Sequence, residues 1–189
     1  MDDSGQRTAA IDSSSASVSS AVSIVPVAPC GRFSLRCEPG AVVGLHIRQS
    51  LRLDFPINSC LADGEHTCAR LGPDEWLLLT SETEADRMAQ EVQTALSGRT
   101  FSLVDISHRN VAFSITGHRA RDTINSGCPL DLADRAFPAG TATRTLLGQA
   151  EIVLIRRPGE PTYRIECWRS FARYVHGILK AGAAEFRGT

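Results

Sequence analysis

The stretch HTCARLGPDEWLLLTSETEADRMAQEVQTAL, residues 66–96, has the pattern of a strand, a tight turn, a second strand and a helix. A second stretch, AEIVLIRRPGEPTYRIECWRSFARYVHGILKAG, residues 150–182, repeats that order. The GPDE and PGEP segments between the strands are good turns, because proline presets φ and Gly or Asp tolerates the remaining angles. A duplicated β–β–α unit predicts two matching half-domains packed as one pseudo-symmetric body.

Both predicted helices have apolar residues at the i, i+3, i+4, i+7 spacing that places side chains on one helical face. The predicted inward positions are Ala85, Met88, Ala89 and Val92 in the first helix, and Phe171, Tyr174, Val175 and Ile178 in the second. Ser81 and Glu84 match a capping box, and Ser170 is a candidate N-cap for the last helix.

The sequence also predicts the character of individual strands and one further helix. Trp76 to Thr80 is a continuous apolar run, as in a strand covered on both faces. In the second half, His108 to Ile115 alternates as a strand, and a helix follows from Thr116 with Ala120, Thr123 and Ile124 inward. The second half is therefore β-α-β-β-α, and the first half resembles it with a less regular beginning.

These elements predict the α+β class, with two similar β-α-β-β-α half-domains that have antiparallel sheets. The predicted boundaries are a disordered serine-rich tail over residues 1–25, a first half-domain over 26–99 and a second over 100–189.

Composition excludes several functional classes. With 42% apolar and 22% charged residues, the chain has the composition of a soluble globular protein. No run reaches the roughly 18–20 apolar residues of a membrane helix, and no secretory signal is recognisable, so a cytoplasmic location is expected. No dense basic stripe interleaved with aromatic residues is apparent, which argues against nucleic-acid binding.

The six cysteines form no CxxC pair and have no histidine at zinc-ligand spacing, so reduced thiols are expected. Cys128 follows a predicted helix, where a thiolate is disfavoured unless Pro129 opens a new helix. A buried, inert thiol is the preferred interpretation of Cys128, and Cys167 is interpreted as a core residue.

No glycine-rich phosphate loop of either common type is present, so this chain is expected to bind no cofactor itself. The one polar cluster at a predicted strand edge is DISHRN, residues 105–110. As part of an enzyme, His108 would carry a proton and Asp105 would orient it. As part of a surface turn, Asp105 or Ser107 would cap backbone amides and Arg109 would form an ion pair, which is the preferred interpretation.

Two further features allow more than one interpretation. Trp76 and Trp168 occupy similar places in the two units, and core packing accounts for both, although tryptophan is also a frequent contact anchor. The pairs Arg156–Arg157 and Arg169–Arg173 could dock an acidic partner, but solvation is the simpler interpretation.

Four segments carry a family resemblance: LGPDEWLLL, DISHRNVAFSITGHRARDTINSGCPLDL, ATRTLLGQAEIVL and RIECWRSFARYVHGIL. Together they resemble the gamma subunit of heterotetrameric sarcosine oxidase, over about residues 32–179. More remotely, Asp105, Ser107 and His108 followed by Gly117 and Ala120 resemble part of the aminomethyltransferase fold of the glycine cleavage T-protein.

The resemblance implies a subunit that acts by assembly with alpha, beta and delta subunits. It implies that the other subunits hold FAD, FMN, NAD, zinc and tetrahydrofolate, and that the complex converts sarcosine to glycine, 5,10-methylenetetrahydrofolate and hydrogen peroxide. The family assigns no catalytic, cofactor or metal residue to gamma, so none is predicted here. The candidate interface residues are Asp105, His108, Arg109, Trp168 and Arg169.

Two alternatives stay open. One is a free-standing folate-binding transferase of the same fold, with Asp105 or His108 at the reactive centre. The other is an equivalent non-catalytic module of another N-methyl amino acid demethylase.

Overall fold

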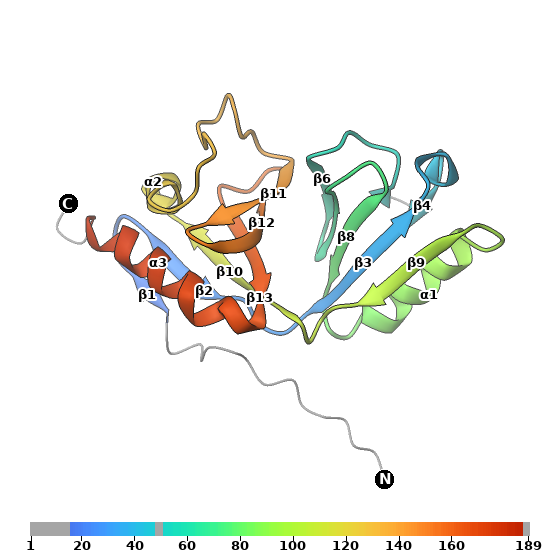
Figure 1. Cartoon of the computed structure of the whole chain (residues 1–189), viewed down its shortest axis with the longest axis horizontal. Coiled ribbons are helices and arrows are strands. Elements are labelled where there is room, and N and C mark those ends of the chain that lie inside the picture. The colour runs from blue at the N-terminus through green and yellow to red at the C-terminus, as the bar shows by residue number, and fades with distance from the viewer. Residues whose placement is uncertain (1–15, 48–50, 187–189) are drawn as a thin grey trace, which may run out of the picture.

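The computed structural model describes residues 16–47 and 51–186. Most of its strands lie in one antiparallel, strongly curved sheet (Figure 1). The strands of this sheet are β1 (Ser17–Val18), β2 (Ser23–Pro26), β3 (Gly31–Cys37), β6 (Ser59–Asp63), β7 (His66–Arg70), β8 (Glu75–Thr80), β9 (Phe101–Asp105), β10 (Asn110–Thr116), β11 (Thr141–Leu147), β12 (Ala150–Arg156) and β13 (Tyr163–Trp168). The remaining elements are η2 (Pro39–Val42), β4 (His46–Ile47), β5 (Leu51–Arg52), α1 (Ala85–Ala95), α2 (Ala120–Asn125), η3 (Arg169–Phe171) and α3 (Ala172–Ala184).

The strand order is β1-β2-β10-β13-β12-β11-β6-β7-β8-β3-β9. We call the strands β6-β7-β8-β3-β9, together with α1, the first lobe. The strands β1-β2-β10-β13-β12-β11, together with α2 and α3, form the second lobe. β2 pairs with β10 of the second lobe, but the next strand in the chain, β3, belongs to the first lobe. β9 pairs with β3 of the first lobe, but the next strand in the chain, β10, belongs to the second lobe. The chain therefore crosses between the lobes twice, at residues 27–30 and 106–109 (Figure 1).

The prediction of separate antiparallel sheets was wrong in one respect, because the two lobes share a single sheet. The junction is narrow, with one bridge between Ser59 of β6 and Thr141 of β11. The amide of Cys60 also donates to the carbonyl of Gly140 at 2.7 Å. Pairing at this point satisfies backbone groups that two separate sheets would leave exposed at their edges. In the first lobe a short 3-10 turn, η2, follows β3 where the second lobe has α2 after β10.

Continuous apolar strands have both faces covered, as their composition predicted. In β8, Trp76 and Leu78 face α1, while Leu77 and Leu79 belong to a cluster between the lobes. β12 follows the same rule, with alternate residues packed toward α3 and toward that inter-lobe cluster. The inter-lobe cluster consists of Cys60, Ala69, Leu77, Leu79, Ile106, Ala142, Val153 and Ile155.

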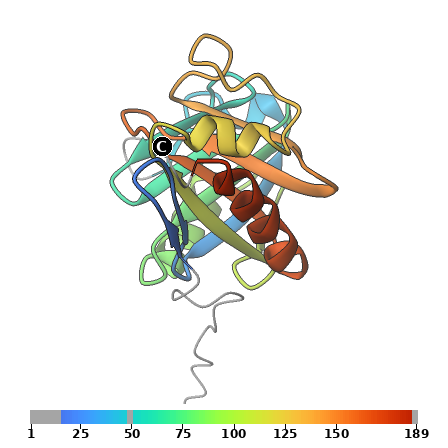
Figure 2. The ribbon, with the colours of Figure 1, turned by 90° about the vertical axis from the view of Figure 1, so that its left-hand side faces the viewer.

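The face that the last helix buries overlaps the predicted one only in part. Val175 is buried and Ile178 packs partly buried against the same core, as predicted, but Phe171 and Tyr174 are exposed and Leu179 is buried instead. The helix turns small residues toward α2, and a Cβ on Gly182 would lie 2.8 Å from the carbonyl oxygen of Thr123. This close approach leaves no room for large side chains on that face of α3, and Phe171 and Tyr174 lie on its exposed side. Figure 2 shows α3 in front of the sheet.

The predicted helix starts also differ from the observed ones. Glu84 rather than Ser81 occupies the N-cap of α1, and neither α1 nor α3 has a side-chain cap. Ser170 lies inside the 3-10 turn η3, which precedes α3. The second helix starts at Ala120, but its predicted inward residues are all buried.

Part of the predicted tail is ordered. Residues 16–25 contain β1 and most of β2, and Ala21, Val22 and Ile24 are buried. Gly117, at φ +106°, approaches this segment so closely that a Cβ would lie 2.4 Å from the carbonyl oxygen of Ala21. The serine-rich composition concealed this apolar strand, while residues 1–15 lie outside the described part. Among residues 16–47 and 51–186, none of the helices has both the length and the apolar composition that a membrane span requires.

Candidate functional site

The DISHRN segment forms the second crossing between the lobes. Asp105 accepts a hydrogen bond from the amide of Ser107 at 2.8 Å, and the buried Ser107 hydroxyl accepts one from the amide of Arg32 at 2.8 Å. Asp105 and His108 are both exposed, and among the described residues no hydrogen bond joins them. The preferred interpretation of Asp105 as a turn residue is therefore confirmed, and the proton-transfer interpretation has no geometric support.

Beneath this crossing lies a buried ion cluster. Glu166 of β13 accepts from Arg32 of β3 at 2.7 Å and from Arg164 at 2.6 Å, and all three residues have low exposure. Arg164 also donates to the sulfur of Cys30 at 3.3 Å. Burial acts to lower the pKa of Arg164, but the charges and hydrogen bonds of Glu166 and Cys30 together outweigh it, and the pKa lies above its ordinary value. The ion pair between Arg32 of the first lobe and Glu166 of the second therefore connects the two lobes.

A row of exposed aromatic and arginine side chains runs along the second lobe. We call it the ridge, and it consists of Arg109, Trp168, Arg169, Phe171, Arg173 and Tyr174. Three of the predicted interface residues belong to it, because the pairing of Asn110 with Trp168 brings β10 and β13 side by side. The guanidinium of Arg109 lies 5.9 Å from the ring centre of Trp168, and the amide of Arg169 donates to the carbonyl of Arg109 at 2.8 Å.

The two tryptophans do not occupy similar places, since Trp76 is near the start of β8 and Trp168 is the last residue of β13, and their environments differ. Trp76 is fully buried, whereas Trp168 is 47% exposed. Core packing is therefore confirmed for Trp76 and wrong for Trp168. Arg109 forms no ion pair with another described residue, so that part of the prediction was also wrong. Asp105 and His108, the other two predicted interface residues, precede the ridge at the crossing, and their role stays a prediction.

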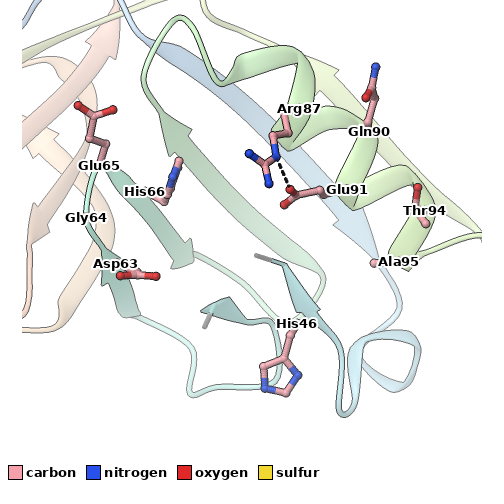
Figure 3. Close-up of a pocket in the computed structure, with 10 residues that line it drawn as sticks. All are labelled: His46, Asp63, Gly64, Glu65, His66, Arg87, Gln90, Glu91, Thr94 and Ala95. Carbon is pink, nitrogen blue, oxygen red and sulfur yellow. Dashed lines mark hydrogen bonds and ion pairs between the residues drawn. The ribbon is translucent and has the colours of Figure 1, made fainter. Parts of the chain in front are cut away.

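An open hollow of about 990 Å³ lies in the first lobe, between α1 and the β6–β7 turn (Figure 3). Asp63 and Glu65 lie on one side and Arg87 and Glu91 on the other, the last two joined at 3.0 Å. A ring nitrogen of His66 is hydrogen-bonded to the hydroxyl of Thr80 at 2.8 Å. Within residues 16–47 and 51–186, no three side chains of the metal-binding types come together as a site. The hollow is lined by charged side chains and by two histidines, His46 and His66.

All six cysteines are described, and none is in a disulfide. Cys128 and Cys167 are buried, as predicted. Burial raises the pKa of Cys60 to about 12, and burial together with Glu166 raises that of Cys167 to about 12. Cys30 is the one cysteine of intermediate exposure.

We expect one fast-reacting thiol out of six. At pH 8, a disulfide reagent should label Cys30 quickly and the five buried thiols only at the rate of unfolding, because the thiolate is the nucleophile. The measurement is the amplitude of the fast phase, and the variant Cys30→Ser should remove it. Two or more fast thiols in the wild-type chain would contradict the burial.

The same thiols predict how stability depends on pH. The pKa values of Cys37, Cys60, Cys68 and Cys167 are higher in the folded chain than in the unfolded chain, where a thiol ionises at about 8.5. The contribution of these thiols to the free energy of unfolding is therefore fully present below about pH 8.5. It is lost as pH rises toward about 12, where Cys60 and Cys167 ionise in the folded chain.

Comparison with known proteins places this geometry in context. The family model described as "Sarcosine oxidase, gamma subunit family" matches residues 37–185. A sarcosine oxidase subunit gamma from Arthrobacter sp. is 27% identical over 169 residues, which are 87% of this chain and 82% of the relative. Another from Corynebacterium sp. (strain P-1) is 32% identical over 112 residues, which are 59% of this chain and 54% of the relative.

Two solved structures share the fold. A chain of heterotetrameric sarcosine oxidase from Corynebacterium sp. U-96 matches with a TM-score of 0.76 and 24% identity, over 94% of this chain and 91% of that one. The glycine cleavage system aminomethyltransferase T from Bartonella henselae matches with a TM-score of 0.62 and 15% identity, over 89% of this chain and 47% of that one. The curved mixed α/β architecture is thus common to both.

Proposed function

The chain belongs to the sarcosine oxidase gamma subunit family, and from that premise we propose that it is the gamma subunit of a heterotetrameric sarcosine oxidase and acts by assembly. The observation that carries the proposal is the family match over residues 37–185, nearly the whole described chain. The described residues add a second argument, since they contain a two-lobed sheet and an exposed ridge, and no three of their side chains of the metal-binding types come together as a site.

In this proposal the partners are alpha, beta and delta subunits in the cytoplasm. FAD, FMN, NAD, zinc and tetrahydrofolate would be held by those subunits, and the complex would convert sarcosine, oxygen and tetrahydrofolate to glycine, 5,10-methylenetetrahydrofolate and hydrogen peroxide. This chain would contribute contact surface and no reacting group.

We also propose that the two lobes are related by an approximate twofold symmetry. The strand order supports this, because β2-β10-β13-β12-β11 on one side corresponds to β9-β3-β8-β7-β6 on the other, with α3 and α1 at equivalent positions. The exchange of β2 and β9 between the halves would tie the two lobes together. The half-domain boundary near residue 100 is part of this proposal.

Co-expression with the other three subunits tests the function. A tag on this chain should recover all four chains in one peak, and that peak should have a flavin absorbance spectrum and oxidise sarcosine. Recovery of the tagged chain alone, while the other three subunits form an active complex without it, would contradict the proposal.

A free-standing transferase of the same fold makes the opposite prediction. The isolated chain should then bind tetrahydrofolate, which titration calorimetry can measure. The likeness to aminomethyltransferase T shows a shared fold alone, and the engagement of Asp105 in a turn does not favour this alternative.

A further inference from the structure

We propose that the ridge is the surface by which this chain docks, and that its partner is an acidic protein surface with an apolar recess for Trp168. Carboxylates of that surface would meet Arg109, Arg169 and Arg173. This inference rests on the proposed function, since it names the chemistry of the contact by which the subunit assembles.

The first argument is uncompensated charge. Between Arg169 and Ala184, every charged residue is basic: Arg169, Arg173 and Lys180. None of these, nor Arg109, has a carboxylate within ion-pair distance among the described residues. Most other described arginines do have such a partner, including exposed ones such as Arg87 and Arg144. The ridge therefore lacks the carboxylates that accompany arginines elsewhere on this chain.

The second argument is the order of the exposed aromatic rings. Trp168, Phe171 and Tyr174 are 47%, 37% and 41% exposed, and each ring packs on the next at centroid distances of 6.5 and 6.4 Å. The hydroxyl of Tyr174 accepts from the amide of Gln149 at 3.0 Å, which holds the end of the row. Side chains that are already ordered lose little entropy on binding, and tryptophan, tyrosine and arginine are the residues that most often dominate binding energy.

The third argument concerns the class of partner. Basic residues interleaved with aromatic rings can also bind nucleic acid. This chain has a formal net charge of −1, and its acidic first half would repel a polyanion beyond the ridge. An acidic protein surface needs to be complementary in charge only over the contact area, so the acidic residues elsewhere on this chain do not oppose its binding.

The experiment compares the same kind of substitution, Arg→Glu, at three positions on the ridge and at one position away from it. The ridge variant carries Arg109→Glu, Arg169→Glu and Arg173→Glu. The control is Arg99→Glu, because Arg99 is exposed and unpaired among the described residues but lies after α1 in the first lobe. The binding of each purified chain to the complex of the other three subunits is measured at 0.15 M and at about 0.5 M salt, since salt shortens the range of charge interactions.

We expect the ridge variant to bind about 100-fold more weakly or worse, because carboxylates would then face carboxylates. Arg99→Glu should bind within about 3-fold of wild type, and wild-type binding should weaken as salt rises. Circular dichroism and the unfolding midpoint check that each variant is folded. Should the triple variant misfold, the corresponding Arg→Gln triple variant replaces it, with an expected loss of about 10-fold.

The outcomes separate the two proposals. Wild-type binding with an unaffected ridge variant would overturn the ridge and leave the proposed function in place. No binding of the wild-type chain would overturn both. Self-association, or binding of a single-stranded oligonucleotide, that is lost in the ridge variant while subunit binding persists would assign the ridge to another occupant and overturn this inference.

Discussion

Replacing Glu166 with alanine should destabilise the folded chain by about 3–5 kcal/mol, the usual loss when one partner of a buried ion pair is removed. The Glu166 side chain is 0% exposed, and that of Arg32 is 2% exposed. Without Glu166, Arg32 would keep a buried charge whose remaining described contact is the carbonyl of Cys30 at 3.2 Å. The free energy of unfolding, measured with urea, provides the test.

The neighbouring strand offers a matched control. Glu151 of β12 also pairs with an arginine, Arg144, at 3.0 Å, but its side chain is 55% exposed. Glu151→Ala should therefore change the free energy of unfolding by about 0–1 kcal/mol. Equal effects of the two substitutions would mean that the Glu166 cluster is hydrated in solution and does not join the lobes as a buried unit.

A third variant separates charge from packing. Glu166→Gln keeps the size of the side chain and its hydrogen-bonding oxygen but removes the negative charge. We expect it to lose most of what Glu166→Ala loses, because two guanidinium groups would remain without a counter-charge. A Gln variant as stable as wild type would show that volume, and not charge, is what the site requires.

This cluster also shows where prediction from the sequence stops. In YRIECW, residues 163–168, Arg164 and Glu166 alternate with apolar residues, which is the pattern of a strand with one face in water. That second face instead lies against the other lobe, so its charges are buried together with Arg32. Local alternation cannot reveal this, because a distant segment supplies the cover.

The sequence predicted the buried face of a helix or strand correctly where that face is set by residues close in the chain. The apolar run of β8 and the buried face of α1 follow directly from residue spacing, and both were confirmed. In α3 two apolar faces compete, one with aromatic residues and one with small ones. The choice depends on how closely α2 approaches Gly182, which is a tertiary property.

Only part of the candidate interface was predicted, because its assembly also depends on tertiary structure. Arg109, Trp168 and Arg169 could be named from sequence, but only the pairing of β10 with β13 brings them into contact. Phe171 and Tyr174 were assigned to the core, and their exposure extends the predicted patch into the ridge. The available signal was the absence of any acidic residue between Glu166 and Glu185.

Trp76→Ala should destabilise the chain by about 3–5 kcal/mol, the range for large aromatic residues removed from a core. Trp76 is fully buried, its indole nitrogen donates to the carbonyl of Leu53 at 3.0 Å, and Arg70 lies 5.0 Å from the ring centre. The substitution would leave a cavity beneath α1 and an unsatisfied carbonyl. Urea unfolding measures the loss, and a change below about 1 kcal/mol would contradict the packing described for the first lobe.

Trp168→Ala, in β13 of the second lobe, should have the opposite profile. Its ring is half exposed, so we expect the free energy of unfolding to change by about 0.5 kcal/mol or less. Binding to the other three subunits should weaken at least about 10-fold, because an ordered tryptophan in a recess is a typical dominant contact. The two tryptophans, one near the start of β8 and the other at the end of β13, would then serve different purposes, one holding the first lobe together and the other holding the chain to its partner. A Trp168 variant that unfolds easily but binds normally would reverse that assignment.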